Sequence, residues 1–232
     1  MQIEVLENAD AVAKKAAVII ADEARNVVTA RGRFVMAVSG GQTPWLMLRA
    51  LANEDVPWDH VHLAQVDERV APPEHPDRNL THLRESLLSR APLRPEYVRP
   101  MPVELPDLRA AAGHYSETLL EIAGSPPILD LVHLGLGPDG HTASLVPGDP
   151  VLAVIDRDVA LTGNYQGRRR MTLTYPILNR SRRILWVVTG EEKAAALARL
   201  RKADHSIPAG RVDQERGQLL VDRAAASKLP AD

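Results

Sequence analysis

Short apolar segments alternate with helical segments along most of this chain, and this order restricts the fold more than any other feature. Strands are predicted from apolar runs at residues 34–38, 61–66, 128–134, 183–189 and 218–221. Helices are predicted from apolar residues at helical spacing at residues 10–30, 44–51, 80–88 and 194–200. Strands that alternate with helices usually pair in parallel, because each helix carries the chain back across the sheet.

The length and composition agree with one such domain. The chain has 232 residues, and 45% of them are hydrophobic, so it can bury a full core. Only 3 Trp, 4 Tyr and 1 Phe are present, so Ala, Val, Leu and Ile must fill that core. We therefore predict a single α/β domain over residues 1–232, with a mostly parallel, Rossmann-like sheet and helices on both faces.

Charge and residue usage exclude several classes of function. The chain carries 28 Lys and Arg against 30 Asp and Glu, a net charge of −2, which lacks the basic excess of nucleic-acid binders. It has no cysteine, so disulfides, thiolate nucleophiles and cysteine-based zinc sites are excluded, as is usual in a reducing compartment. The apolar run at residues 16–21 is too short for a signal peptide, and no run is long enough for a membrane span. We predict a cytoplasmic protein with no nucleic-acid or membrane partner.

The first loop with chemical potential is Ser39-Gly40-Gly41-Gln42-Thr43, between a predicted strand and a predicted helix. Small residues here let backbone N–H groups approach an anion, and a helix N-terminus favours negative charge, so the loop is a candidate phosphate site. The equally good alternative is a tight turn with Thr43 as helix N-cap and Pro44 at the first helical position. The loop lacks the Gly-Lys-Ser/Thr ending of nucleoside triphosphate sites.

A second loop contains Gly135-x-Gly137-x-x-Gly140 and matches the dinucleotide-binding fingerprint literally. Asp139 opposes that function, because it places a carboxylate where a pyrophosphate would approach. We favour a different interpretation, in which the glycines make room for Asp139 and His141 at a strand tip, where an imidazole can accept a proton. The alternative for His141 is a helix-start histidine bonded to the backbone.

Further polar residues have weaker signals. His133 lies inside an apolar strand and is interpreted as a core histidine, while His60 and His62 share a strand face but lack a third metal ligand, so no metal is predicted. Asp67 and Arg69 are predicted to end a strand, which would bring them into the same crevice as the two loops.

Several basic residues are candidates for binding a phosphate group. Arg170 and Lys193 offer a guanidinium fork and a point charge. The neighbouring Arg168 and Arg169 are interpreted as solvated surface.

Together these loops resemble the 6-phosphogluconolactonase family, within the larger group that includes glucosamine-6-phosphate deaminase. The resemblance spans most of the chain and rests on five ordered motifs: residues 39–44, 67–69 with 76–79, 135–148, 170–174 and 190–193. The sequence departs from the family pattern at Gln42, where Ser is frequent, at Arg78, where a small residue is usual, and at Val146, where Phe is typical.

The resemblance implies hydrolysis of 6-phospho-D-glucono-1,5-lactone to 6-phosphogluconate, in the oxidative pentose phosphate pathway, without a cofactor. The substrate is then the only expected partner, and we expect a monomer or a weak homo-oligomer. The resemblance implies that His141 is the general base, oriented by Asp139, with Arg69 facing the carbonyl oxygen or hydroxyls. It also implies a sugar site shaped by Asp67 and Asn79. The implied phosphate-binding and secondary residues are Ser39, Gly40, Gly41, Gln42, Thr43, Arg170 and Lys193, with Ser144 near the base.

Two other functions remain open. A deaminase or isomerase of glucosamine 6-phosphate shares the phosphate loop but requires a carboxylate shortly after the histidine, and residues 142–148 contain no acid. A catalytically silent sugar-phosphate sensor would normally carry a DNA-binding module, for which this chain has no spare basic segment.

Overall fold

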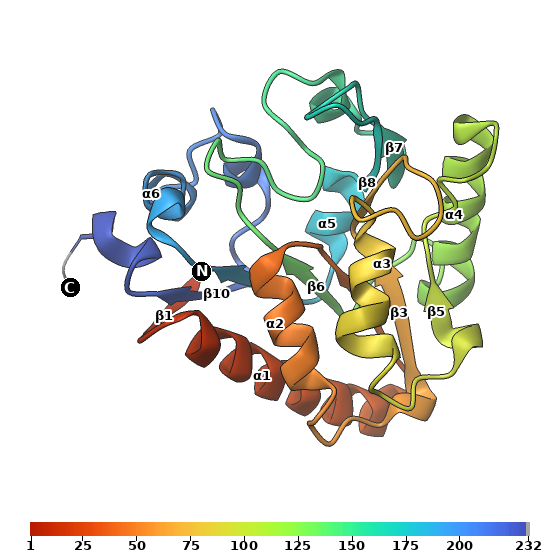
Figure 1. The fold of residues 1–232 in the computed structure, drawn as a ribbon, viewed down its shortest axis with the longest axis horizontal. Coiled ribbons are helices and arrows are strands. Elements are labelled where there is room, and N and C mark those ends of the chain that lie inside the picture. The colour runs from red at the N-terminus through yellow and green to blue at the C-terminus, as the bar shows by residue number, and fades with distance from the viewer. Residues whose placement is uncertain (231–232) are drawn as a thin grey trace.

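A seven-stranded, fully parallel sheet forms the centre of the fold (Figure 1). The computed structural model describes residues 1–230. In spatial order the strands are β1 (Gln2–Leu6), β10 (Gly217–Asp222), β9 (Ile184–Val188), β6 (Leu131–Leu134), β2 (Phe34–Val38), β3 (Val61–Gln65) and β5 (Val98–Arg99). The predicted mostly parallel α/β architecture is confirmed.

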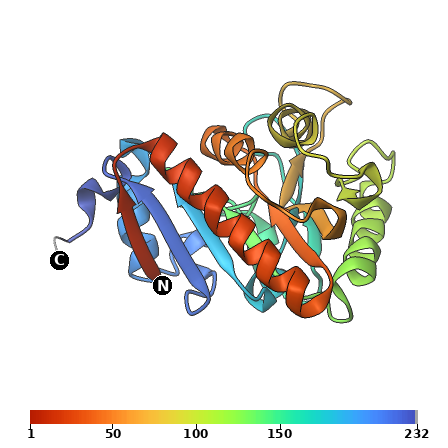
Figure 2. The same cartoon turned by 90° about the horizontal axis from the view of Figure 1, so that it is seen from below.

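Helices cover both faces of this sheet, as predicted. One layer contains α1 (Ala9–Arg31), α2 (Gln42–Leu51) and α3 (Asn79–Leu83), and the other contains α4 (Leu108–Ala123), α5 (Tyr175–Arg180) and α6 (Ala194–Arg201). Figure 2 shows α1 crossing the strands of the sheet on the first face. The side chains of β2 alternate between the layers: Phe34 and Met36 belong to the cluster with α1, whereas Val35 and Ala37 belong to the cluster with α4.

The strand order reverses between β2 and β6. From β2 the chain proceeds to β3 and then to β5, on one side, whereas from β6 it proceeds to β9 and β10, on the other. The loops that follow β2 and β6 therefore leave in opposite directions, and open α/β sheets bind ligands in the crevice at such a point.

A second, antiparallel sheet interrupts the alternation of strands and helices. Its order is β4 (Asp67–Arg69), β8 (Arg170–Leu173) and β7 (Val159–Leu161), and its apolar side chains join the same core cluster as α4. Asp67 and Arg69 thus form a strand of their own, which corrects the prediction that they end the preceding strand. Pairing with β8 places Arg69 directly opposite Arg170, although the two residues are distant in sequence.

Several element boundaries differ from the predictions. The strand predicted at residues 128–134 begins only at Leu131, and the helix predicted at 80–88 continues from α3 as a π-helical turn, Arg84–Leu88. His60 ends a 3-10 turn before β3, so it does not share a strand face with His62. Strands β1, β5, β7 and β8 and helices α4 and α5 were not predicted. Among residues 1–230, no helix is both long and apolar enough to cross a lipid bilayer.

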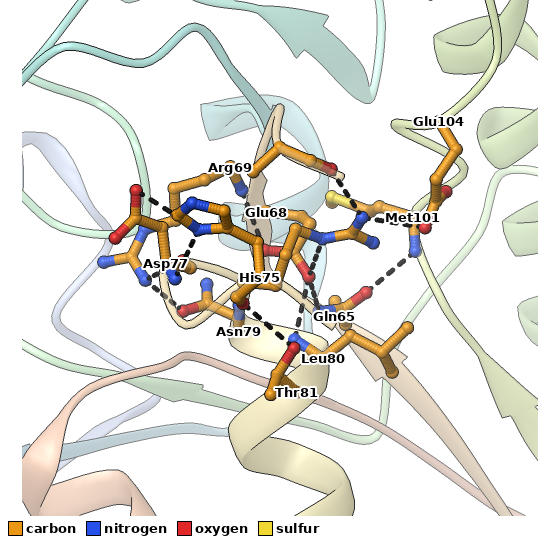
Figure 3. A network of polar contacts seen from close by, with 12 residues as sticks. Gln65, Glu68, Arg69, His75, Asp77, Asn79, Leu80, Thr81, Met101 and Glu104 are labelled. Atoms are coloured by element: carbon orange, nitrogen blue, oxygen red, sulfur yellow. Dashed lines mark hydrogen bonds and ion pairs between the residues drawn. The ribbon is translucent and has the colours of Figure 1, made fainter. Parts of the chain in front are cut away.

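A buried carboxylate joins the second sheet to α3. Glu68 has no exposed surface, and its oxygens accept hydrogen bonds from the backbone N–H groups of Arg69 (2.8 Å), Asn79 (2.7 Å) and Leu80 (2.8 Å). The side-chain amide of Gln65 donates a further bond at 3.0 Å (Figure 3). One side chain therefore sets the backbone positions of both Arg69 and Asn79.

Arg78 supplies the counter-charge for this carboxylate. Its side chain is 1% exposed, and its Nε lies 3.2 Å from a Glu68 oxygen. Its Nη1 lies 2.7 Å from a Glu104 carboxylate oxygen and donates to the carbonyl of Ala71 at 3.0 Å. Arg78, one of the three departures from the family pattern, is therefore a core ion-pair partner, and it does not line the cavity described below.

We expect Arg78→Ala to lower the free energy of unfolding by about 3 kcal/mol or more, because it leaves Glu68 charged and buried without a counter-ion. Arg94→Ala is the matched control, since Arg94 pairs with Asp59 and Glu96 at the surface and such pairs contribute less than about 1 kcal/mol. Urea unfolding of the two variants checks this. Equal losses of unfolding free energy in the two variants would show that the buried ion pair contributes no more than a surface pair.

Candidate active site

A cavity of about 560 Å³ opens at the carboxyl ends of β2 and β6, where the strand order reverses. Most of the predicted site residues line it: Ser39, Gly40, Gly41, Gln42, Thr43, Asp67, Arg69, Asn79, His141, Arg170 and Lys193. Asp139 and Ser144 are not in the lining, but each is hydrogen-bonded to a residue that is, Asp139 to His141 and Ser144 to Asp67. The imidazole of His141 therefore shares one cavity with Arg69, Arg170 and Lys193.

Asp139 and His141 form a hydrogen-bonded pair in the loop after β6. Asp139 Oδ1 lies 2.6 Å from Nδ1 of His141 and also accepts the His141 backbone N–H at 3.1 Å. Partial burial raises the pKa of Asp139, but the charge and hydrogen bonds of His141 and a hydrogen bond from Tyr165 bring it below the usual value. Because an ionised carboxylate only accepts hydrogen bonds, Nδ1 of His141 carries a proton, so in the neutral form of the imidazole the lone pair is on Nε2.

The glycine before this pair is required by contact. A Cβ atom at Gly137 would lie 2.0 Å from Nδ1 of His141 and 2.6 Å from Oδ1 of Asp139. The Gly137 N–H also donates to the His141 carbonyl at 2.8 Å, so the loop closes on itself. This confirms that the glycine leaves room for the Asp139–His141 pair. No helix begins at His141, since residues 138–146 form turns and an isolated bridge.

The loop after β2 ends at the N-terminus of α2. The helix begins at Gln42, and its N-cap is Gly41, at φ 128°, with no side-chain capping bond. This corrects the alternative with Thr43 as N-cap, because the Thr43 hydroxyl instead lies 2.5 Å from the hydroxyl of Thr189. The first N–H groups of a ten-residue helix therefore face the cavity without a side-chain cap, which favours an anion.

Ser39 joins the start of the loop after β2 to strand β6. Its backbone N–H donates to Nδ1 of His133 at 3.3 Å, and its hydroxyl donates to the His133 carbonyl at 3.0 Å. Burial lowers the pKa of His133 to about 3, so this core histidine is neutral and accepts the bond. Both hydrogen-bond donors of Ser39, the backbone N–H and the hydroxyl, are thus committed to His133 and not to a ligand.

A chain of hydrogen bonds supports the cavity wall formed by Asp67, Arg69 and Asn79. The buried Ser144 hydroxyl donates to Oδ2 of Asp67 at 2.6 Å, and the Asn79 amide donates to the Asp67 carbonyl at 2.9 Å. Nη1 of Arg69 donates to Oδ1 of Asn79 at 2.6 Å. A Cβ at Gly40 would lie 1.9 Å from that Asn79 oxygen, so the loop after β2 needs glycine to approach this wall.

Three cations, Arg69, Arg170 and Lys193, line the cavity together with the carboxylates of Asp67, Glu192 and Asp222. The Nε atoms of Arg69 and Arg170 are buried and have no hydrogen-bond partner within residues 1–230, and both side chains line the cavity. Burial lowers the pKa of Arg170 from its high usual value, and Asp67 opposes this shift. Lys193, in the 3-10 turn Glu191–Lys193 after β9, reaches the cavity with its Nζ 3.8 Å from a Glu192 oxygen.

The sequence analysis missed several residues of the site. Gln166, Thr189, Glu192 and Asp222 line the cavity, and Tyr165 donates to Oδ2 of Asp139 at 3.0 Å. Two of them had a usable signal: Glu192 lies within the motif at residues 190–193, and Asp222 directly follows the last predicted strand at the carboxyl edge of the sheet. Arg168 is not free surface either, since it forms an ion pair with Asp77 at 2.9 Å.

The arrangement has the parts needed to hydrolyse an anionic ester. A carboxylate-oriented imidazole can take a proton from water, guanidinium donors can stabilise a developing oxyanion, and the helix terminus with Lys193 can hold a phosphate.

Comparison with known proteins agrees with this arrangement. Residues 7–221 match the family model described as glucosamine-6-phosphate isomerases/6-phosphogluconolactonase. The chain is 35% identical to the 6-phosphogluconolactonase of Synechocystis, over 98% of both chains, and 36% identical to the human 6-phosphogluconolactonase, over 86% of this chain and 82% of the human one. The crystal structure of the Thermotoga maritima 6-phosphogluconolactonase superposes with a TM-score of 0.84 at 28% identity, over 95% and 98% of the two chains. This chain belongs to the glucosamine-6-phosphate isomerase/6-phosphogluconolactonase family.

Proposed function

We propose that this protein hydrolyses 6-phospho-D-glucono-1,5-lactone to 6-phosphogluconate. The observation that carries the proposal is that the imidazole of His141 and the cationic groups Arg69, Arg170 and Lys193 line one cavity of about 560 Å³. A phosphorylated lactone needs a base near its reacting carbonyl carbon and cations near its phosphate, so both must lie in the same cavity. The names of the relatives support the same activity.

In this proposal His141 is the general base. Nε2 takes a proton from water as the water oxygen bonds to C1 of the lactone, and the imidazolium is stabilised by Asp139. The tetrahedral intermediate then breaks its bond between C1 and the ring oxygen, which receives the proton back from Nε2. No cofactor is needed for either step, because only protons are transferred.

The wall formed by Asp67, Arg69 and Asn79 faces the reacting end of the sugar. Nη1 of Arg69 is fixed by Asn79 and by the Asp77 carbonyl, which leaves the other terminal nitrogen, Nη2, for the carbonyl oxygen or a hydroxyl. A donor that is already oriented stabilises the oxyanion without reorganisation during the reaction. Asp67, held by Ser144, offers an acceptor for a sugar hydroxyl.

The phosphate is assigned to the N-terminus of α2, with backbone N–H groups from residues 40–43, and to the side chains of Lys193 and Arg170. A helix N-terminus with a cation beside it is a common way to bind a phosphate. Gln42, the departure from the family pattern in this loop, sits at the first position of α2 and lines the cavity. It offers a side-chain amide where a hydroxyl is more frequent.

A coupled assay tests the proposal directly. Freshly generated 6-phosphogluconolactone is followed with and without the protein, and disappearance faster than the spontaneous rate is the expected result. Glucosamine 6-phosphate is tested in parallel, and release of ammonia from it would replace the proposal with a deaminase. Binding of 6-phosphogluconate without any turnover would favour a sensor.

We expect His141→Ala to lower kcat by roughly 10²- to 10⁴-fold, as for the loss of a positioned general base. Binding of 6-phosphogluconate, followed by calorimetry, is expected to survive, because the phosphate and hydroxyl contacts remain. His205→Ala is the matched control, since His205 is exposed and outside the cavity. A kcat close to that of the unmodified protein would remove His141 from the mechanism.

We expect Lys193→Ala to raise KM by about 10- to 100-fold with a smaller change in kcat, because it removes a charge-assisted bond to a group that does not react. Inhibition by inorganic phosphate should weaken in parallel. Lys202→Ala, at an exposed position outside the cavity, serves as the control. If kcat fell while KM and phosphate inhibition stayed constant, Lys193 would act on the reacting end instead.

A further inference from the structure

Tyr165 lies at the tip of the hairpin that joins β7 to β8. Its backbone N–H donates to the Arg168 carbonyl at 2.9 Å, and the Arg168 N–H donates back at 3.2 Å. The two residues between them, Gln166 and Gly167, have φ values of 53° and 79°, as required at both central positions of a type I′ turn. The tip is therefore a defined turn that carries Tyr165 toward the loop after β6.

The Tyr165 side chain contacts both halves of the site. Its hydroxyl donates to Oδ2 of Asp139 at 3.0 Å, while the other oxygen of the same carboxylate bonds to His141. The rings of Tyr165 and His141 meet edge to face, with centroids 5.6 Å apart. The guanidinium of Arg170 lies over the Tyr165 ring, 4.8 Å from its centroid.

The hairpin tip is also held from its other side. Nε of Arg168 pairs with Oδ2 of Asp77 at 2.9 Å, and its Nη2 lies 3.2 Å from Nε2 of His75. Nη2 of Arg170 donates to Oε1 of Gln166 at 3.2 Å. The tip is thus tied to the loop before α3 as well as to the loop after β6, which limits the positions that Tyr165 can take.

We propose that Tyr165 is a positioning residue, which holds the carboxylate of Asp139 in the plane that orients the imidazole of His141. This rests on the proposed function. Within residues 1–230, the Tyr165 hydroxyl is the one group that bonds Oδ2 of Asp139, since both bonds from His141 go to Oδ1. Without it the carboxylate can rotate about its side chain while keeping one oxygen near His141.

The protonation of Tyr165 suits this role. Burial and the adjacent Asp139 raise the pKa of the phenol above its usual value, so the hydroxyl keeps its proton and remains a donor at neutral pH. Hydrogen bonds of this kind, to a group that orients a reactive histidine, are a general way to fix an imidazole in one tautomer.

Tyr165→Phe tests the proposal, because it removes the hydroxyl and keeps the ring under Arg170. We expect kcat to fall about tenfold, the fold-change for loss of one hydrogen bond to a charged group, with KM unchanged. Tyr97→Phe is the matched control, since Tyr97 contacts His62 and Arg94 and lies outside the cavity. A kcat for Tyr165→Phe equal to that of Tyr97→Phe would overturn the proposal.

A double-mutant cycle shows whether Tyr165 acts through Asp139. In the Asp139→Ala background, Tyr165→Phe should change kcat by less than about twofold, because the acceptor is already gone. A further tenfold loss in that background would mean that Tyr165 acts on the substrate itself, which contradicts a positioning role. Tyr165→Ala also removes the ring under Arg170, so KM should rise only in that variant.

A measurement without substrate separates this proposal from the proposed function. In ¹⁵N-labelled protein, exchange of the His141 Nδ1 proton with water should be faster in Tyr165→Phe than in the unmodified protein or in Tyr97→Phe. Unchanged exchange would count against the positioning role even if the lactone is the substrate. Absence of lactonase activity with faster exchange would refute the proposed function and leave the role of Tyr165 in place.

Discussion

The reversal of strand order between β2 and β6 is the constraint on which the rest of this site depends. It separates two loops that would otherwise pack side by side, and the cavity occupies the resulting space. Two hydrogen bonds between Ser39 and His133 join the start of the loop after β2 to the neighbouring strand β6. The helix terminus of α2 and the Asp139–His141 pair then face the same space from opposite strands.

The second wall of the cavity is built differently, around a buried charge. The Glu68 carboxylate accepts hydrogen bonds from the backbone N–H groups of Arg69, Asn79 and Leu80 and does not line the cavity. Burying a carboxylate is costly unless it is hydrogen-bonded and paired, and here the N–H donors and Arg78 offset that cost. Glu68 thus fixes the backbone positions of Arg69 and Asn79. Its counter-charge comes from Arg78, at a position where the family pattern usually has a small residue.

The sequence predicted the five inner strands of the large sheet but missed its two edge strands, β1 and β5, and did not predict the small sheet. Strands buried on both faces are continuous apolar runs, so the bounds of β2 were predicted without error and those of β3 and β9 to within one residue at each end. The strands β4, β7 and β8 have only three or four residues, and β4 is fully charged, so neither length nor pattern marks them. Helix α4, by contrast, has an Asp107 N-cap and a periodic apolar face that a closer analysis of the sequence would have identified.

The sequence by itself determined which local segments form, and which residue types stand at the strand ends, because apolar periodicity and glycine requirements act over a few neighbouring residues. It thereby placed His141, Asp139 and the loop after β2 at one edge of the sheet. Only the tertiary structure decided the partners of these groups: Ser144 meets Asp67 across 77 positions, and Tyr165 meets Asp139 across 26. Hydrogen bonds between segments so far apart depend on how the two sheets pack, and no local pattern carries that information.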